Sequence, residues 1–413
     1  MSFRKIQIFM IALCLTLGMT LSALAASPSQ FVRIGIREGR SAVSVLGPEG
    51  LIIYMNGKEW KKIAPNTPVY VAMQGKNLAV NGTASTGTVL IRPAKPNGAV
   101  KITDGYSYRG AIECIKTPQA WGLTVVNVVP LEEYLYGVVG KEMSPSWNLE
   151  ALKAQAVAAR TYAVAHKNYF QKKGYDMTDD TRSQVYSGIN GESPSIIQAV
   201  KATSGEILTY GGKPIEALFH ANGGGWTEDS ENVWGNRIDY LRGVEDKTQT
   251  TPAYKWTAKT TPEAMAAKLN AAGKGVGTVQ AITLSPLTKR PMSVKDRGKS
   301  GRVLSLTIKG SKGQVTVTGN AFQSIFGLKS TLFDFTLNPG LVPDPEKNGN
   351  KRAVELKVRP KQDITIYGFG WGHGLGMSQY GANEMAKENA KDTKYYRQIL
   401  QHYYTGTKLE QVK

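Results

Sequence analysis

The residue pattern changes at Pro130, and this change constrains the fold more than any other feature of the sequence. Before it, short stretches of alternating apolar and polar residues are separated by Gly, Pro and Asn, as is typical of β-strands joined by turns. The expected strands are Phe31–Arg37, Leu51–Tyr54, Thr88–Arg92 and Gly122–Val129. Residues 27–119 are therefore predicted to form a small β-rich N-terminal region.

After Pro130, helix-forming residues dominate. Asn148 is suited to cap a helix that carries Glu150 in its first turn and runs to about Gln171, before Gly174. Further helices are expected at Ser195–Thr203, Thr261–Ala271, Asn320–Phe326, Ser378–Lys387 and Tyr395–Tyr404. The combined pattern predicts an α+β fold, in which helices and antiparallel strands surround a substrate groove.

Two internal segments differ from their surroundings. Residues 247–342 contain alternating strands of their own, at Arg302–Ile308 and Gln314–Thr318, and are read as an inserted α/β segment. Residues 343–352 are polar and interrupted by Pro and Gly, so they are expected to form an exposed linker.

The first 26 residues have the pattern of a signal peptide. Arg4 and Lys5 precede an apolar run from Ile6 to Leu21, and Ala23-Leu24-Ala25 offers a cleavage site. The sequence therefore predicts a protein exported to the cell wall or the outer face of the membrane. A leader retained as a membrane anchor is the alternative.

The chain has 51 Lys and Arg residues against 32 Asp and Glu residues, a formal charge of +19. This charge favours polyanionic partners. For an exported protein the anionic cell wall is a better partner than nucleic acid, so no nucleic-acid partner is expected. The alternative is that the positive charge only keeps the protein soluble. After cleavage Cys114 is the one cysteine left, so no internal disulfide is expected.

Glu142 is the first candidate for chemistry. It ends an apolar stretch and stands near Tyr136, Met143 and Trp147, where partial burial would raise the pKa of its carboxyl group into the range of a general acid. Trp147 is suited to stack on a sugar ring. The alternative is a surface glutamate that pairs with Lys141 or caps the next helix.

The helix after Asn148 presents two faces. An apolar stripe of mostly small residues favours close packing against a sheet: Leu149, Leu152, Ala156, Ala159 and Ala163. Lys153, Arg160 and Lys167 recur every seven residues on another face. That face either lines a groove for an anionic ligand beside Glu142 or is a solvated basic stripe.

Two Gly-rich segments, Phe219–Ser230 and Gly368–Gly381, lack the Lys-Ser/Thr ending of a phosphate loop. Their glycines allow a second backbone or a flat ligand to approach closely. His373 either polarises a substrate oxygen or hydrogen-bonds backbone in a tight turn.

The chain offers His220, His373, Glu142, Asp179 and Asp180 as candidate metal ligands, but no metal-ligand spacing supports a metal site. Neither a metal nor a cofactor is expected. The sequence has no Gly-x-Ser-x-Gly elbow, the motif that would support a Ser-His hydrolase. A hydrolytic glycosidase needs two carboxylates, whereas the sequence singles out one.

Several ordered motifs resemble the SpoIID/LytB family, named after stage II sporulation protein D and the amidase enhancer LytB. They are Leu131–Met143, Glu150–Tyr162, Ser183–Tyr186, Ala199–Leu208, His220–Gly235, Tyr240–Val244, Gly368–Ala382 and Tyr403–Gly406. The resemblance covers about residues 120–413, interrupted at 247–342, and implies a catalytic domain over this range.

The resemblance implies a peptidoglycan lytic transglycosylase, which cuts after N-acetylmuramic acid without water and leaves a 1,6-anhydro ring. The sugar supplies its own nucleophile, so one general acid/base is sufficient. Glu142 matches that residue. Lys153 and Arg160 match groove positions, and His220, Gly224, Trp371 and His373 match groove-forming loops that bind substrate.

The substrate implied is a peptidoglycan glycan strand, stripped of its stem peptides in the sporulation branch. The LytB branch implies an alternative, a non-catalytic wall-binding protein that stimulates an amidase. Some members of the family bind zinc through Cys and His residues around the motif that corresponds to Ser183–Tyr186. In this chain Ser183 occupies a Cys position of that motif, so no zinc is expected.

Overall fold

The computed structural model describes residues 31–338, 345 and 352–412. The expected signal peptide lies outside this range, as does most of the expected linker. The described chain forms two compact units, one of residues 31–134 and 168–189 and the other of residues 135–167 and 190–412. We call them unit 1 and unit 2.

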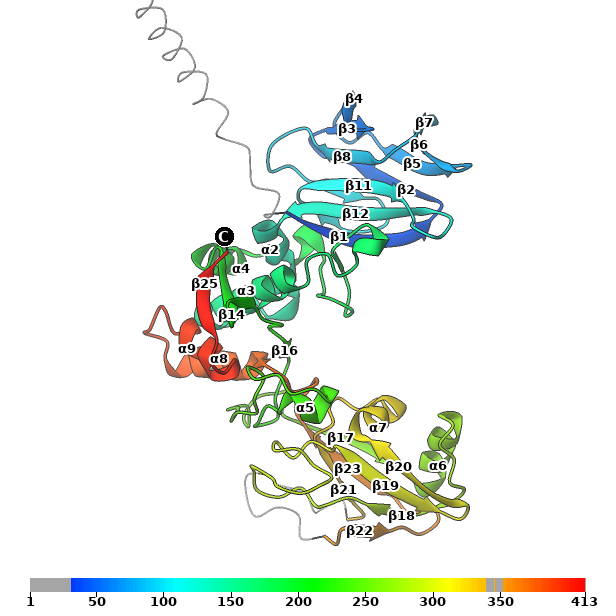
Figure 1. The fold of residues 1–413 in the computed structure, drawn as a ribbon, viewed down its shortest axis with the longest axis vertical. Coiled ribbons are helices and arrows are strands. Elements are labelled where there is room, and N and C mark those ends of the chain that lie inside the picture. Colours follow the sequence, from blue (N-terminus) through cyan, green and yellow to red (C-terminus); the bar gives the residue numbers. More distant parts are fainter. Residues whose placement is uncertain (1–30, 339–344, 346–351, 413) are drawn as a thin grey trace, which may run out of the picture. The chain divides into compact units, whose positions relative to one another are not determined.

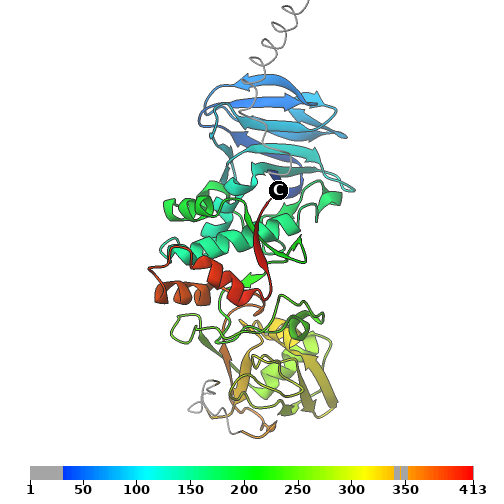
Figure 2. The same cartoon turned by 60° about the vertical axis from the view of Figure 1, so that its left-hand side comes forward.

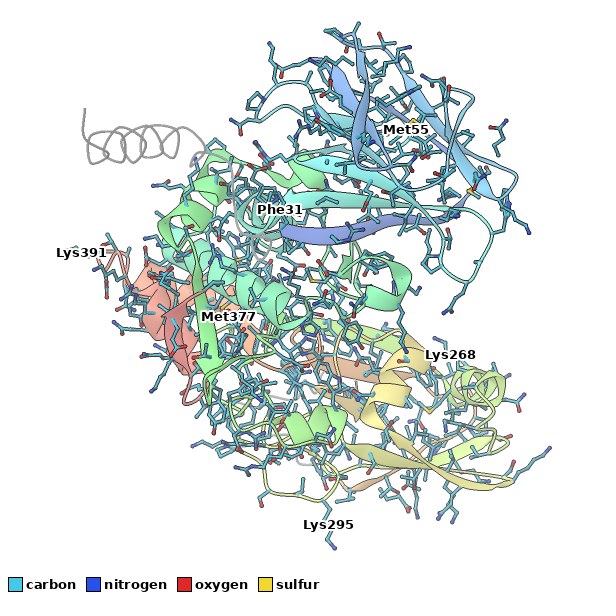
Figure 3. The ribbon with its side chains drawn as sticks, turned by 45° about the horizontal axis from the view of Figure 1, so that its top comes forward. Phe31, Met55, Lys268, Lys295, Met377 and Lys391 are labelled. Carbon is cyan, nitrogen blue, oxygen red and sulfur yellow. The ribbon has the colours of Figure 1, made fainter. Side chains whose placement is uncertain are left out.

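Unit 1 contains two antiparallel-rich sheets (Figure 1). The first has the order β13-β1-β12-β11-β8-β3-β4: Met177–Thr178, Phe31–Arg40, Leu123–Pro130, Ala111–Lys116, Val89–Pro93, Leu51–Met55 and Lys58–Ile63. The second has the order β10-β9-β2-β5-β6-β7: Ser107–Tyr108, Val100–Ile102, Ala42–Leu46, Val69–Gln74, Asn77–Val80 and Thr83–Ser85. Phe31 and Met55, labelled in Figure 3, mark the start of β1 and the end of β3.

Alternation of buried and exposed residues builds the core of unit 1. Ile34, Leu51 and Ile53 are fully buried, as are Val69 and Val71 of the second sheet. Strand β12 pairs with both β1 and β11, and its residues are buried at nearly every position. A strand at the centre of a sheet with both faces covered reads as a continuous apolar run, as Leu123–Val129 does.

The division of the chain differs from the expected boundary at residue 119. Strands β11 and β12 pair along six residues on either side of that point, so unit 1 continues to residue 134. It also includes residues 168–189, because β13 pairs in parallel with β1 through Ile34 and Met177. The expected boundary was placed where the resemblance to the family begins, and a local resemblance carries no information about which strands pair.

Unit 2 carries most of the helices: α3 (Leu149–Ala165), α4 (Pro194–Ala202), α5 (Ser230–Trp234), α6 (Pro262–Ala271), α7 (Gly319–Phe326), α8 (Gln379–Glu388) and α9 (Tyr396–Tyr403). Helix α2 (Leu131–Glu142) begins in unit 1 and ends in unit 2, and was not expected as a helix. Helix α3 ends six residues earlier than predicted, at Ala165. Figure 2 shows the C-terminal helices α8 and α9 beside α3.

The inserted segment is larger than expected. Its sheets are β17-β23-β21 (Lys255–Thr260, Ile364–Phe369, Phe333–Thr336) and β20-β19-β18-β22 (Gly313–Thr318, Ser305–Gly310, Val279–Thr283, Glu355–Lys357). Because β22 and β23 follow the linker, this part of the fold closes near residue 369 rather than 342. Helices α6, which carries Lys268 (labelled in Figure 3), and α7 pack on a core centred on Phe322, Phe333 and Phe335.

The remaining strands of unit 2 are short. One sheet has the order β15-β14-β25 (Lys213–Pro214, Glu206–Tyr210, Lys408–Gln411), and another pairs β16 (Phe219–His220) with β24 (Met377–Ser378). Two single-turn 3-10 helices, Gln171–Lys173 and Gly188–Gly191, complete the described elements. Met377, labelled in Figure 3, begins β24.

Candidate active site around Glu142

Glu142 is the last residue of helix α2 and is half-buried. Glu132 and Glu133 in the first turn and Lys141 in the last turn complement the helix dipole and favour this helix over a loop. The side-chain amide of Gln379, at the start of α8, donates a hydrogen bond from Nε2 to Oε2 of Glu142 at 3.2 Å. The carboxylate therefore has a fixed partner from a segment 237 residues away.

The loop 143–148, which joins Glu142 to helix α3, is held by the first turns of α8. Trp147 packs against Tyr380, with ring centroids 4.8 Å apart. The backbone N–H of Asn148 donates to Oδ1 of Asn383 at 3.0 Å, and the Asn148 side chain caps α3. Together with the bond from Gln379, these contacts fix Glu142 and an aromatic surface in one place.

A third element reaches the same loop. Ser195, at the start of α4, donates from Oγ to the Pro145 carbonyl at 2.7 Å. Gln155 of α3 lies within 3.5 Å of the Gln379 amide, and its own Nε2 is buried without a hydrogen-bond partner among the described residues.

The two Gly-rich segments lie side by side, as the short ladder between β16 and β24 shows. His220 pairs with Ser378, and Asn222 and Trp371 exchange both backbone hydrogen bonds, at 3.0 and 2.8 Å. Gln379 directly follows this ladder. The pairing of the two Gly-rich segments thus positions Gln379, the residue that holds Glu142.

The glycines permit close approach of backbone, one of the two roles considered for them. A Cβ at Gly370 would lie 2.6 Å from the Asn222 carbonyl oxygen, and one at Gly376 would lie 2.0 Å from the Leu218 carbonyl oxygen. A Cβ at Gly224 would likewise lie 3.0 Å from the Gly370 nitrogen. These glycines are explained by chain packing, and Gly224 is walled in by protein atoms.

His220 and His373 form a neutral pair with ring centroids 5.3 Å apart. Nδ1 of His220 lies 3.1 Å from the Leu375 carbonyl and so carries its proton. His373 accepts the Leu375 N–H at Nδ1, and so carries its proton on Nε2, 3.1 Å from the Phe219 carbonyl. Burial and the nearby Arg302 lower the pKa of His373 to about 4, and burial with His373 and Arg302 lowers that of His220.

This assignment answers the question left open for His373, whose two ring nitrogens are both used by backbone groups. The free lone pair belongs to His220, whose Nε2 is buried with no partner among the described residues. The ring centroid of Trp234 lies 5.4 Å from that of His373, and Trp234 is half exposed. Trp371 is also half exposed, and the Lys329 ammonium lies 4.4 Å from its ring centroid.

Arg302 is a residue that the sequence did not single out as functional. It is buried and donates to the carbonyls of Gly372 at 3.0 Å and Gly223 at 3.3 Å, which ties the two Gly-rich segments together. Burial lowers its pKa to about 10, so it stays charged at neutral pH. The one local sequence signal for it is the stretch Ser300-Gly301-Arg302-Val303, within the inserted segment.

Lys153 and Arg160 need a correction, because neither open reading of the basic face describes them. The Lys153 ammonium is buried, 2.6 Å from Glu150 Oε1, and donates to the Thr393 carbonyl at 2.9 Å. Arg160 is fully buried and donates to the carbonyls of Glu206 and Val200. Both join α3 to its neighbours, so this face is neither solvated nor an open groove.

In the described part of the chain, no three His, Cys, Asp or Glu side chains gather in a geometry suited to a metal ion. Asp180 and Ser183 instead form a local network with Thr178, in which the Ser183 hydroxyl accepts the Thr178 N–H at 3.2 Å. None of the helices within the described ranges is long and apolar enough to span a membrane.

Fold and site together define an α+β protein with one positioned glutamate beside an aromatic surface and Gly-rich loops. A family model for a stage II sporulation protein, SpoIID, matches residues 119–210, and one for a domain of unknown function, DUF8618, matches residues 229–376.

Three relatives extend the comparison. Stage II sporulation protein D of Bacillus subtilis is 34% identical over 303 residues, which cover 69% of this chain and 76% of that protein. An uncharacterized protein of Brachyspira hyodysenteriae is 34% identical over 306 residues, 73% of this chain and 72% of that protein. The amidase enhancer of Bacillus subtilis is 32% identical over 340 residues, 77% of this chain and 46% of that protein. The chain belongs to the SpoIID family.

Proposed function

We propose that this protein acts on the bacterial cell wall as a peptidoglycan lytic transglycosylase, with Glu142 as its general acid and base. The observation that carries the proposal is the Glu142 carboxylate, half-buried and held by Gln379 beside Trp147 and Tyr380. A fixed carboxylate next to an aromatic face suits acid catalysis on a sugar that stacks on that face.

The reaction needs one such group. The Glu142 carboxyl group gives its proton to the glycosidic oxygen while the bond from C1 of N-acetylmuramic acid to that oxygen breaks. The 6-hydroxyl oxygen of the same sugar then bonds to C1, and its proton passes to the Glu142 carboxylate. The carboxyl group is restored and a 1,6-anhydro end is left. Because both reacting groups belong to one sugar, the second step gains from proximity.

The binding residues of the proposal are those that face solvent. Trp147 lies in the loop 143–148 and packs on Tyr380. Trp234 is half exposed beside His373, and Trp371, two residues before His373 in the chain, is also half exposed. Lys153 and Arg160 keep a structural part, because their charges are used within the protein. The leader at residues 1–26 supports a place outside the cytoplasmic membrane, where the glycan strands are.

The test uses purified residues 27–413 and the variant Glu142→Gln on glycan strands, both intact and stripped of peptides, with products read by mass spectrometry. We expect 1,6-anhydro ends from the wild type, a loss of about 1,000-fold or more in the variant, and retained binding of strands. Glu388→Gln, which changes an exposed glutamate paired with Lys247, is the matched control and should keep full activity. Equal cleavage by Glu142→Gln would refute the assignment.

A second candidate function rests on the relative named amidase enhancer. In that case the protein binds the wall without cutting it and raises the activity of an N-acetylmuramoyl-L-alanine amidase. Strand binding without cleavage by the wild type, together with faster release of stem peptides when an amidase is added, would establish this function in place of the first.

A further inference from the structure

A cavity lies in unit 1, and none of its lining residues is among those proposed for catalysis. It has a volume of about 290 Å³ and is lined by Gly35, Ile36, Arg37, Glu38, Arg40, Tyr175, Asp179, Asp180 and Arg182. Strand β1 is irregular at this point, with register shifts between Gly35 and Arg37 and between Arg37 and Arg40. Bulges of this kind re-aim side chains and are frequent next to binding sites.

Part of the charge around the cavity is already paired. Arg182 makes a two-pronged contact with Asp180, with Nε and Nη2 within 3.1 Å of its oxygens. Glu38 accepts a hydrogen bond from Lys173 at 3.1 Å. The charges within each of these two pairs neutralise each other, and the pairs hold the edge of the cavity in place.

Three charged groups of the cavity remain uncommitted. Within the described ranges, neither Arg37 nor Arg40 forms an ion pair with a carboxylate, and the Arg37 guanidinium donates only to its neighbour, the Ile36 carbonyl, at 3.0 Å. Asp179 likewise has no ion pair there, although its pKa responds to Arg37. The guanidinium and the carboxylate face one cavity without reaching each other, and so leave space between opposite charges.

A buried tyrosine packs against both segments that carry these charges. Tyr108 is fully buried, and its ring contacts Tyr186 with centroids 5.9 Å apart. The Tyr186 N–H in turn donates to the Asp179 carbonyl at 3.0 Å. The turn before Tyr108 lies against Arg37, because a Cβ at Gly105 would lie 3.3 Å from Nη2. Tyr108 therefore supports the cavity without lining it.

We propose that this cavity binds a small zwitterion, the ammonium and carboxylate of an α-amino acid group. Asp179 receives the ammonium, and Arg37 receives the carboxylate with Arg40 at the rim. Tyr175 forms the wall, since its ring covers Gly35 so closely that a Cβ there would lie 2.8 Å away. A purely anionic ligand would leave Asp179 unpaired, and a purely cationic ligand would leave Arg37 unpaired.

This chemistry has two sources, a free amino acid and a peptide whose diamino acid side chain ends in the same group. The proposal does not depend on the cleavage reaction. The probes are alanine, propionate and ethylamine at matched ionic strength, then meso-diaminopimelate and the tripeptide L-alanyl-γ-D-glutamyl-meso-diaminopimelate. Binding to residues 27–413 is followed by calorimetry between about 1 μM and 10 mM, the range open to ligands of so few atoms.

We expect alanine to bind at least about 10-fold more tightly than propionate or ethylamine, because only the zwitterion pairs both charges. Comparison of meso-diaminopimelate with the tripeptide then identifies the source. Asp179→Asn and Arg37→Gln should each weaken binding about 10-fold or more. The matched control is Glu59→Gln, which alters an exposed carboxylate of β4 that pairs with Lys62 outside the cavity, and should change binding less than about 2-fold.

No binding of any probe up to 10 mM would overturn the proposal. So would equal affinity for alanine and propionate, or equal losses in Asp179→Asn and Glu59→Gln.

Discussion

At the scale of single residues, two buried amide side chains help to position Glu142. Gln379 donates to Glu142 and lies within 3.5 Å of Oε1 of Gln155, and both amides are buried. Amides fix the position of a carboxylate without adding charge to the site. This is the arrangement expected for a group that must both give and take a proton in one reaction.

Gln379 is therefore predicted to be a positioning residue. Gln379→Met should lower kcat on glycan strands by about 10- to 100-fold, because the carboxylate loses its fixed orientation, while strand binding in a pull-down assay stays unchanged. Gln398→Met, which alters an exposed glutamine bonded to Asp392, serves as the control. Weaker binding with unchanged kcat would assign Gln379 to substrate contact instead.

Asp179 and Asp180 are neighbours with opposite pKa shifts. Burial raises the pKa of Asp179 to about 6, opposed by Arg37 and Arg182, whereas hydrogen bonds from Arg182 lower that of Asp180 to about 2. The raised value means that Asp179 costs stability as pH rises from about 4 to 6, since the unfolded chain ionises first. The lowered value means that Asp180 contributes stability above pH 4 and loses it toward pH 2.

The two substitutions should thus differ in sign, as urea unfolding at pH 3, 5 and 7 would show. Asp179→Asn should gain free energy of unfolding over the wild type as pH rises toward 7. Asp180→Asn should lose free energy of unfolding over the same range. Parallel pH profiles for the two variants would contradict the assigned environments.

At the scale of elements, helix α2 carries Glu142 and is positioned by a close contact of backbone. A Cβ at Gly140 would lie 1.8 Å from the Gly191 carbonyl oxygen, and a Cβ at Gly191 would lie 2.4 Å from the Gly137 carbonyl oxygen. Neither contact leaves room for a methyl group. The end of α2 therefore lies directly on the turn that precedes α4, the helix whose Ser195 holds Pro145.

This contact reverses the usual effect of a helix glycine. Alanine in place of glycine normally stabilises a helix by about 1 kcal/mol, but Gly140→Ala should lower the free energy of unfolding by about 1–3 kcal/mol because the chain must move apart. Cleavage should fall as well, since Glu142 moves with the helix. Ser324→Ala, at an exposed position of α7, is the control and should be within about 0.5 kcal/mol of wild type. A stabilised Gly140→Ala would contradict the packing.

At the scale of the whole molecule, the chain leaves unit 1 after Tyr134 and returns to it at residues 168–189. The intervening residues 135–167 belong to unit 2 and contain helix α3. The N-terminal strands are thus part of one sheet with a segment from the middle of the family-matched region, through the pairing of β1 with both β12 and β13.

A chain that begins at residue 120 is accordingly predicted to fold poorly. It keeps the apolar strand Leu123–Pro130 but loses both sheet partners, β1 and β11, and an unpaired apolar strand aggregates. Solubility and near-ultraviolet circular dichroism of residues 120–413, compared with 27–413 and 31–413, would test this. A soluble 120–413 with an intact spectrum would show that the N-terminal strands are dispensable.

The sequence by itself determined the type and order of most elements. Turn residues and alternation located the strands around 31–37, 51–54 and 122–129, and caps located α4, α6, α7, α8 and α9 within a residue or two. It also singled out Glu142 and predicted that the glycines of the two Gly-rich segments allow a second backbone or a flat ligand to approach closely. These features are encoded within a few residues, because periodicity, capping and glycine geometry are local properties.

Only the tertiary structure decided which side chains meet. Gln379 reaches Glu142 across 237 residues, and Lys153 and Arg160 turn inward because Thr393, Val200 and Glu206 supply carbonyls that the pattern on α3 cannot show. The cavity of Arg37 and Asp179 joins two segments about 140 residues apart. A charged side chain pairs with whatever the folded chain brings near it, so its partner is a property of packing and not of local sequence.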